Sequence, residues 1–470
     1  MNVREEEKRL NLRKLIGNRA FYRKLFAVML PILVQNVITN FVSLLDNIMV
    51  GQVGTEPMSG VAIVNQLLFV FNLCIFGGLA GAGILTAQYF GSGDAKGIAD
   101  TFRAKLYIAL AAVIGFIAVF TLGGETLIRQ FIHEGGEQLD MAATLRHARD
   151  YLEIMLFQIP PFALQMAYSS TLRETGETVL PMKAGITAVM VNLILNYILI
   201  FGKLGAPALG VEGAAVATVI ARYIECGIII VWTHRHRDRN PFLETAYTTW
   251  RIPAALLRRI AAMGLPLLVN ELLWSSGQAI LNQCYSMRGL EVVSAVNISS
   301  TVSQLFFCAF LSMGNATSII VGQLLGAHEL EKAVDEDRKL IAFSVALCAA
   351  VGLVMAFIAP LVPRIYNTSD NVRHIAAELI RVVAVFMPVY AFTNSCYFTL
   401  RAGGQAIITF VFDSLFHWGL VVPLAFVLSR FTGLPILQMY IAIQCMDLIK
   451  CVLGYVLIKK RTWVRDLVAV

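Results

Sequence analysis

Two helical faces in this sequence carry polar side chains at a spacing that suits the wall of an aqueous cavity. On the first face, amides and hydroxyls recur at i, i+4, i+7 and i+11: Asn36, Asn40, Ser43 and Asn47. The same spacing brings together a second set, which is Glu271, Ser275, Gln278 and Asn282, with Trp274 nearby. Residues at this spacing share one side of a helix. We expect both faces to line a substrate cavity; the alternative is hydrogen bonding between neighbouring membrane helices.

Ionisable side chains inside apolar segments are candidates for ion coupling, because a charge near the centre of a bilayer costs at least ~2.5 kcal/mol. Glu271 lies roughly 18 Å along its helix, at about 1.5 Å per residue, and Asp413 lies at a similar depth. Asp46 lies nearer the far end of the first apolar segment, where a plain interfacial position is the alternative. His417 follows Asp413 by four residues and could share a proton with it; a hydrogen-bonded structural histidine is the alternative.

Oppositely charged residues also recur three apart inside apolar segments. The pairs are Arg222 with Glu225, Glu378 with Arg381, and Asp447 with Lys450. We predict mutual neutralisation within each pair, because a paired charge costs less inside a membrane than an isolated one.

The elements that must position these residues are membrane-spanning helices. Hydrophobic residues make up 57% of the 470-residue chain and charged residues 15%, whereas soluble proteins carry roughly 25% charged residues. Mean hydropathy is +0.69. The apolar runs are continuous and do not alternate with polar residues, which argues against a transmembrane barrel. The composition therefore predicts an all-α membrane protein.

Twelve apolar segments have the length of a transmembrane helix. They cover residues 25–50, 60–86, 104–122, 150–171, 180–202, 213–233, 260–285, 292–321, 340–362, 376–400, 406–429 and 434–458. If the N-terminus is cytoplasmic, 27 of the 38 Lys and Arg residues fall on the cytoplasmic side and eight fall outside. The positive-inside rule then predicts that both termini are cytoplasmic.

The chain also contains an internal repeat. With a shift of 235 residues, Leu30-Pro31 matches Leu265-Pro266, and Gln88 matches Gln323. With a shift of 228 residues, Thr171-Leu172-Arg173 matches Thr399-Leu400-Arg401. Each half has an even number of spans, so the two six-helix repeats should be parallel. Duplication of this kind is typical of a transporter whose substrate site lies between two rocking halves.

The repeat and the charge distribution predict five segments. These are a cytoplasmic N-terminal segment (1–24), an N-terminal six-helix lobe (25–233), a basic cytoplasmic connector (234–259), a C-terminal six-helix lobe (260–458) and a cytoplasmic tail (459–470). The carboxylates on the two polar faces are not equivalent, since Asp46 matches Leu281 and Glu271 matches Asn36. We therefore expect one shared substrate site with ion binding specialised by lobe.

Motifs of soluble enzymes are absent from the sequence. It contains no GxxxxGK[ST], GxSxG, HExxH or dinucleotide fingerprint, so we expect neither an enzyme nor an ATP-driven pump, and no cofactor. The eight cysteines form no CxxC pair, which argues against a metal site. The net charge of +7 follows from the cytoplasmic loops and does not imply a nucleic-acid partner. The expected partners are the lipid bilayer and a small molecule.

Several local motifs resemble the multidrug and toxic compound extrusion (MATE) family of secondary transporters. They are Leu30-Pro31, the segment 45–51 (LDNIMVG), the loop 88–94 (QYFGSGD), the repeated Leu-Arg pairs 172–173 and 400–401, and the segment 192–197 (NLILNY). The resemblance covers about residues 21–460. It implies V-shaped MATE-like lobes of twelve helices and an antiporter that expels amphipathic, often cationic compounds in exchange for H⁺ or Na⁺. It also implies location in a plasma membrane, which in a bacterium is the inner membrane.

The resemblance implies roles for three residues of the N-terminal lobe. Asp46 looks like the acidic residue of the family's first helix, and Asn192 and Asn196 resemble a fifth-helix pair that helps form a cation site. The sequence departs from many members in having Asn196 and Gln405 where they have acidic residues. The departures leave the coupling ion and the role of the C-terminal lobe open.

Two other functions remain as alternatives. A flippase for lipid-linked oligosaccharides, of related fold, would need basic residues in the cavity to bind a diphosphate. The bases well inside the predicted spans (Arg222, Arg381 and Lys450) each have an acidic neighbour. A membrane-embedded enzyme is less favoured, because no catalytic spacing supports it. The substrate, the partner proteins and the oligomeric state are not determined by the sequence.

Overall fold

The computed structural model describes residues 15–131, 141–366 and 368–469, and every regular element in these ranges is a helix. Part of the predicted N-terminal segment (residues 1–14), residues 132–140, and residues 367 and 470 lie outside the described part. The N-terminal half contains α2 (Arg19–Gly51), α3 (Thr55–Ser92), α4 (Ala95–Phe131), α5 (Met141–Met155), α6 (Ile159–Glu174), α7 (Val179–Phe201) and α8 (Gly210–Arg235). The short helix α9 (Phe242–Ala246) lies in the connector.

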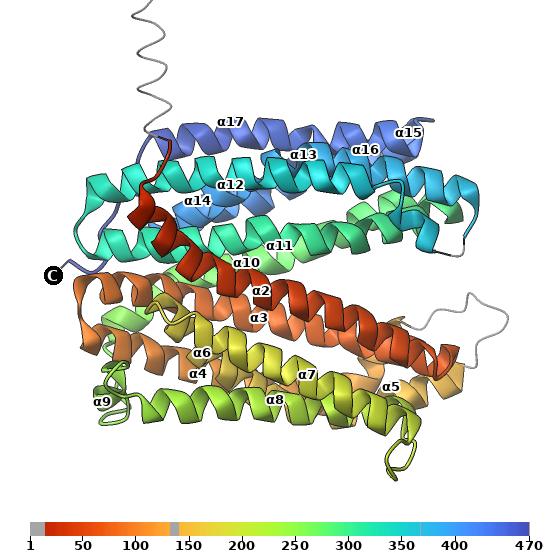
Figure 1. Cartoon of the computed structure of the whole chain (residues 1–470), viewed down its shortest axis with the longest axis horizontal. Coiled ribbons are helices and arrows are strands. Elements are labelled where there is room, and N and C mark those ends of the chain that lie inside the picture. Colours follow the sequence, from red (N-terminus) through yellow and green to blue (C-terminus); the bar gives the residue numbers. More distant parts are fainter. Residues whose placement is uncertain (1–14, 132–140, 367, 470) are drawn as a thin grey trace, which may run out of the picture. The chain divides into compact units, whose positions relative to one another are not determined.

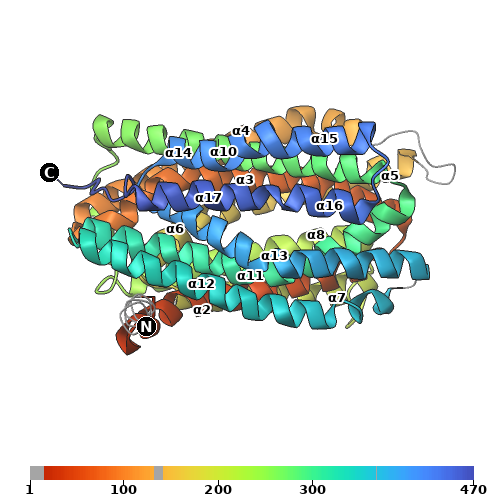
Figure 2. The same ribbon diagram turned by 90° about the horizontal axis from the view of Figure 1, so that it is seen from above.

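The C-terminal half has the same general plan. It contains α10 (Ala254–Ser286), α11 (Leu290–Gly326), α12 (Leu330–Ile358), α13 (Asp370–Ala402), α14 (Ala406–Phe410), α15 (Val422–Phe431), α16 (Ile436–Gln444) and α17 (Met446–Lys459). Two π-helical segments, Val411–Leu415 and His417–Val421, join α14 to α15. In Figure 2, α16 and α17 lie end to end.

The helices account for the twelve predicted crossings. In the described residues, ten helices are long and apolar enough to span a membrane. A further crossing is formed by α5 and α6, which a short 3-10 turn (Leu156–Gln158) separates just before Pro160 and Pro161. The other is α10, whose hydropathy is lowered by Glu271 and its polar face. The all-α, twelve-helix prediction is confirmed.

The described helices form two compact units. The N-terminal unit contains Val34–Thr86 and Ala95–Arg259; the C-terminal unit contains Ala87–Asp94, Ile260–Val470 and the described residues of Met1–Leu33. These boundaries differ from those of the predicted lobes. The first part of α2 and the end of α3 belong to the C-terminal unit, and the connector belongs to the N-terminal unit, because each segment makes most of its contacts there.

Small side chains allow the helices within each unit to approach closely. Ala163, Ala167 and Ala215 are at most 1% exposed in the core of the N-terminal unit. Ala316 and Ala391 are fully buried in the C-terminal unit. Lipid is as apolar as a leucine side chain, so dispersion contacts between closely spaced helices stabilise such a fold more than apolar burial does.

The repeat is visible as a reciprocal contact inside the C-terminal unit. Gly91 near the end of α3 lies against the backbone of Gln323, and Gly326 at the end of α11 lies against the backbone of Gln88. Gly91 and Gly326 are repeat equivalents, as are Gln88 and Gln323. A Cβ atom at either glycine would overlap the facing backbone, so this contact requires glycine on both sides.

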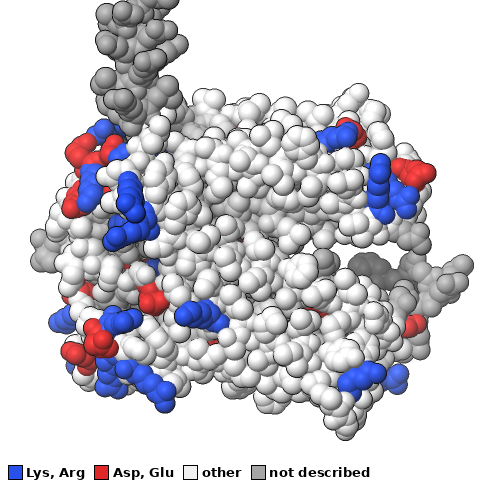
Figure 3. Space-filling view, viewed as in Figure 1, with Lys and Arg blue, Asp and Glu red and all other residues white. Residues whose placement is uncertain are grey.

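Charged side chains gather near the ends of the helices. On the face drawn in Figure 3, the middle of the helices in each unit is largely free of Lys, Arg, Asp and Glu. Such a belt fits a bilayer core, in which exposed charge is costly.

The C-terminal tail is tied to its own unit. Trp463 is 1% exposed, and the fully buried Gln88 side chain donates to the backbone oxygens of Ala402 (3.1 Å) and Arg465 (3.3 Å). The backbone nitrogen of Leu467 in turn donates to Gln88 Oε1 at 2.7 Å. The start of α2 and the C-terminus lie at the same end of the C-terminal unit (Figure 1).

Candidate functional site

An acidic side chain on α2 meets two amides of α7 in the N-terminal unit. Asn196 Nδ2 donates to Asp46 Oδ1 at 2.8 Å. The hydrogen-bond network orients the Asn192 amide so that its nitrogen donates to Asp46 Oδ2 at 2.9 Å and its oxygen accepts from Thr218 Oγ1 of α8 at 3.1 Å. We call Asp46, Asn192, Asn196 and Thr218 the Asp46 cluster.

The local helix geometry explains how α7 supplies both amides. Asn192 and Asn196 are four residues apart, on one face of the helix, and are 8% and 2% exposed. Each donates to a different oxygen of Asp46, which fixes the orientation of the carboxylate. Asn196 Oδ1 is buried without a hydrogen-bond partner among the described residues. An acceptor oxygen is therefore left beside the carboxylate.

The charge of Asp46 has no fixed basic partner in the described part of the chain. The ion pairs formed there involve other acids. Carboxylate and amide oxygens are ligands that hard cations prefer, and a carboxylate can also take up a proton. The Asp46 cluster can thus hold one monovalent cation or one proton.

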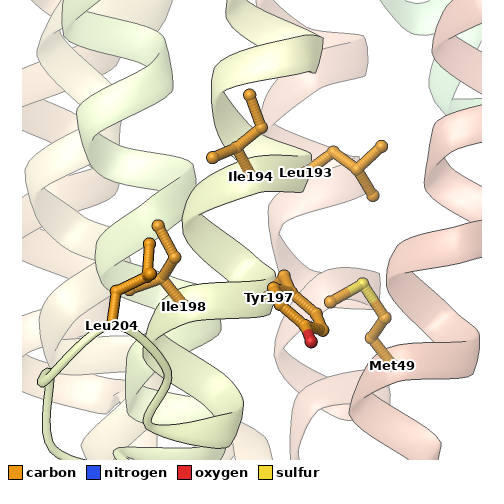
Figure 4. Close-up of a pocket in the computed structure, with 6 residues that line it drawn as sticks. All are labelled: Met49, Leu193, Ile194, Tyr197, Ile198 and Leu204. Atoms are coloured by element: carbon orange, nitrogen blue, oxygen red, sulfur yellow. The ribbon is translucent and has the colours of Figure 1, made fainter.

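An apolar pocket of about 390 Å³ is lined by residues that neighbour the Asp46 cluster in the sequence. Its lining comes from α2, α7 and the turn after α7: Met49, Leu193, Ile194, Tyr197, Ile198 and Leu204 (Figure 4). Met49 follows Asp46 by three residues, and Leu193 and Tyr197 follow the two amides directly. The Asp46 cluster and the apolar pocket therefore share the helices α2 and α7 of the N-terminal unit.

A second polar network lies within the C-terminal unit and joins four elements. Lys450 Nζ of α17 contacts Asp413 Oδ1 at 2.6 Å. Asn270 Nδ2 of α10 donates to Asp413 Oδ2 at 3.0 Å and approaches the Tyr397 hydroxyl at 3.4 Å. Tyr397 of α13 donates to Glu271 Oε1 at 3.1 Å. We call Lys450, Asp413, Asn270, Tyr397 and Glu271 the Lys450 network.

Sharing of a proton between Asp413 and His417 stays a prediction, because no direct hydrogen bond joins the two side chains among the described residues. Asp413 is instead bound by Lys450 and Asn270. Asp413 lies in a π-helical segment, Val411–Leu415, in which the backbone hydrogen bonds join residues five apart. The His417 ring lies against Gly277, and its Nε2 atom has no hydrogen-bond partner among the described residues.

Two of the three predicted ion pairs form and one does not. Arg222 donates to Glu225 at 2.8 Å, and Arg381 contacts Glu378. The prediction that Asp447 neutralises Lys450 directly is wrong, because the Lys450 ammonium is directed to Asp413 on another helix. Nearness in the sequence does not identify the partner of Lys450, because helix packing places the more distant Asp413 against the ammonium.

The two polar faces remain partly accessible on their own units. On α2, Asn36 and Asn40 are half-buried, while Ser43 is exposed. On α10, Ser275 and Gln278 are half-buried, and Trp274 and Asn282 are exposed. Their role in lining a substrate cavity stays a prediction.

The repeat shows that the two clusters are not copies of each other. The equivalents of Asp46, Asn192 and Asn196 in the second half are Leu281, Leu420 and Leu424. The equivalents of Asp413, Glu271 and Tyr397 in the first half are Gly185, Asn36 and Ser169. Apart from Lys450, whose equivalent is Arg222, the ionisable residues of each cluster have no ionisable equivalent in the other half.

The sequence alone did not single out Asn270 or Tyr397, and it did not predict that the Lys450 ammonium points to Asp413. Asn270 directly precedes Glu271 and is the repeat partner of Gln35, which was an available signal. Tyr397 had none, because a tyrosine in an apolar helix is usually part of the core. Gln405 lies between α13 and α14 and donates to the Thr462 backbone oxygen at 2.7 Å.

Twelve crossings in two repeats, with ionisable clusters inside the spans, define a multi-pass helical membrane protein built by duplication. The MatE family model matches residues 31–198 and 266–427, one segment in each half. The chain belongs to this family, the MATE transporters.

Relatives and solved structures agree with this assignment. The chain is 24% identical to a probable multidrug resistance protein NorM of Thermotoga maritima over 420 residues (89% of this chain and 88% of the relative). It is 26% identical to the multidrug resistance protein MdtK of Pectobacterium atrosepticum, with 87% of each chain covered. The fold matches the Vibrio cholerae MATE transporter VcmN (TM-score 0.84, 19% identity, covering 94% and 97%). It also matches an outward-facing multidrug resistance MATE transporter (TM-score 0.83, 19% identity, covering 96% and 97%).

Proposed function

We propose that this protein is a secondary antiporter that exports amphipathic, cationic drugs or toxic compounds in exchange for H⁺ or Na⁺. The coupling ion binds at the Asp46 cluster. The observation that carries the proposal is a carboxylate inside a span with two amide donors and no basic partner among the described residues. A charge so placed costs at least ~2.5 kcal/mol unless a mobile cation compensates it.

The substrate class follows from the surfaces that each unit offers by itself. The polar faces of α2 and α10 offer amides, hydroxyls and the Glu271 carboxylate, and neither face carries lysine or arginine. The exposed Trp274 ring adds a cation–π contact worth about 0.5–2 kcal/mol. In the N-terminal unit, the apolar pocket of about 390 Å³ suits the hydrophobic part of an amphipathic molecule. These features favour an amphipathic cation over an anionic lipid diphosphate.

The protein acts in the plasma membrane, which in a bacterium is the inner membrane, with both termini cytoplasmic. The support for this orientation is the excess of Lys and Arg in the loops on the terminal side. Export then means movement from that side to the opposite one.

The test is efflux of a fluorescent cation from proteoliposomes under an imposed pH or Na⁺ gradient. Asp46→Asn removes the charge but keeps the shape of the side chain, and gradient-driven efflux should be lost. Glu212→Gln, an exposed acid in the first turn of α8, is the matched control and should leave efflux unchanged.

Two results would refute this function. Undiminished gradient-driven efflux by Asp46→Asn at normal expression would remove Asp46 from coupling. Robust flipping of an anionic lipid-linked sugar without dye efflux, in the same proteoliposomes, would replace the drug exporter with a lipid flippase.

A further inference from the structure

The Lys450–Asp413 pair is held in one fixed geometry inside the C-terminal unit. Their side chains are 14% and 15% exposed, and the ammonium and carboxylate are 2.6 Å apart. Asn270, 1% exposed, holds the second carboxylate oxygen and is itself fixed by Ser414, whose Oγ donates to Asn270 Oδ1 at 2.7 Å. Both oxygens of Asp413 are therefore occupied by protein donors.

The position of Lys450 resembles that of a bound cation. Its ammonium contacts the Asp413 carboxylate and lies 5.2 Å from the centroid of the Phe412 ring. Through Asn270 and Tyr397, the pair connects to a second carboxylate, that of Glu271. An oxygen-rich site of this kind would suit an inorganic cation if the ammonium were absent.

The first half shows that this arrangement is not a general property of the fold. Arg222 is the repeat equivalent of Lys450, but it binds Glu225 on its own helix at 2.8 Å. The equivalent of Asp413 is Gly185. The basic residue is thus common to both halves, whereas its use to fill a carboxylate site on another helix is specific to the second half.

The charges of Asp46 and Asp413 are compensated in opposite ways. Asp46 has amide donors and no ion pair in the described residues, so its charge is compensated from solution. Asp413 is compensated by a side chain that cannot leave. A transporter exchanges only those cations that can dissociate.

We propose that the Lys450 ammonium is a tethered cation that replaces an exchangeable metal cation in the C-terminal unit. Asp413 then holds no exchangeable Na⁺, and it adds no ion to those exchanged at the Asp46 cluster. The inference rests on the proposed function in assigning coupling to Asp46. Its structural part, a latent Na⁺ site at Asp413, can be tested without transport.

The experiment measures Na⁺ binding to the full chain in which Asp46→Asn has silenced the first site. Adding Lys450→Gln should create one saturable Na⁺ site, detected with radioactive Na⁺ and as a melting temperature that rises when NaCl replaces choline chloride. Because the Asp413 charge is then uncompensated inside a span, the affinity for Na⁺ should be roughly 50-fold higher than in the Asp46→Asn parent. Lys450→Arg keeps the charge and should show no Na⁺ response, and adding Asp413→Asn to the Gln variant should abolish it.

Two results would overturn the proposal. The first is a folded Asp46→Asn/Lys450→Gln protein without a Na⁺ response, or with one that survives Asp413→Asn. The second result uses Asp413→Asn alone, in the otherwise unchanged chain. This variant should bind as much Na⁺ as the unchanged protein. Less binding would show that Asp413 already holds an exchangeable ion. Continued gradient-driven efflux by Asp46→Asn would instead refute the proposed function. Efflux is measured in a separate experiment from Na⁺ binding.

Discussion

A buried ion pair between α4 and α6 offers a sharp test of how charge is stabilised in the N-terminal unit. Lys105 is completely buried, and its Nζ atom lies 2.5 Å from Glu174 Oε2 and 3.0 Å from Thr171 Oγ1. The Glu174 side chain retains 15% exposure. The two partners therefore differ in their access to water, and their replacement should have unequal effects.

The expected magnitudes follow from this difference in exposure. Glu174→Met leaves a buried ammonium without its carboxylate and should lower the free energy of unfolding by about 3–5 kcal/mol. Lys105→Met leaves a carboxylate that can still reach water, so a loss of about 1–3 kcal/mol is expected. Lys105→Met/Glu174→Met removes both charges and should be more stable than Glu174→Met alone, with a coupling energy above about 2 kcal/mol.

The measurement is equilibrium unfolding of purified variants in mixed micelles of increasing denaturing-detergent content. Thr171→Val is the matched control, because it removes one neutral partner of Lys105 and should cost only about 1 kcal/mol. Additive losses in the double variant would refute the reasoning, since they would mean that the pair does not interact energetically. Equal losses from the two single changes would show that burial of Lys105 is not the controlling feature.

Two further predictions concern buried polar groups of the C-terminal unit. Gln88→Leu removes the side-chain partner of two backbone groups of the tail, at Arg465 and Leu467, and of one at the end of α13, at Ala402, and should cost about 2–4 kcal/mol. Faster proteolysis after Lys460 would confirm release of the tail, and unchanged proteolysis would contradict it. Asp337, 1% exposed, accepts from Thr399 Oγ1 at 2.5 Å. Asp337→Asn keeps an acceptor and should lower the free energy of unfolding by less than about 1 kcal/mol, whereas Asp337→Leu should lower it by about 1–3 kcal/mol. Equal unfolding midpoints for the two variants would exclude a stabilising hydrogen bond between Thr399 and Asp337.

Local patterns were enough to predict the class of fold. A membrane span is defined by the length and hydropathy of one segment, and the repeat by residue identities at constant shifts. The pairing of Asn192 with Asn196 on one face of α7 is also local, because four residues complete about one helical turn. These features need no knowledge of which helices are neighbours.

The composition of the clusters was only partly accessible from the sequence. Asp46, Glu271 and Asp413 stand out as acids in apolar segments, and the structure gives each a defined set of donors. Tyr397 does not stand out, since a phenol inside a span is common, and the only signals at Asn270 are its position beside Glu271 and its repeat partner Gln35. Their importance to the network comes from the contacts that they join.

The sequence by itself determined the helices, the duplication and the acids that lie inside spans. Tertiary structure decided the partner of each acid: Asp46 is bound by an amide 150 residues away, and Lys450 selects Asp413 in preference to Asp447 on its own helix. The rotation of a helix about its axis and the π-helical turns at Val411–Leu415 set these choices. Both depend on close packing with neighbouring helices, which no single segment encodes.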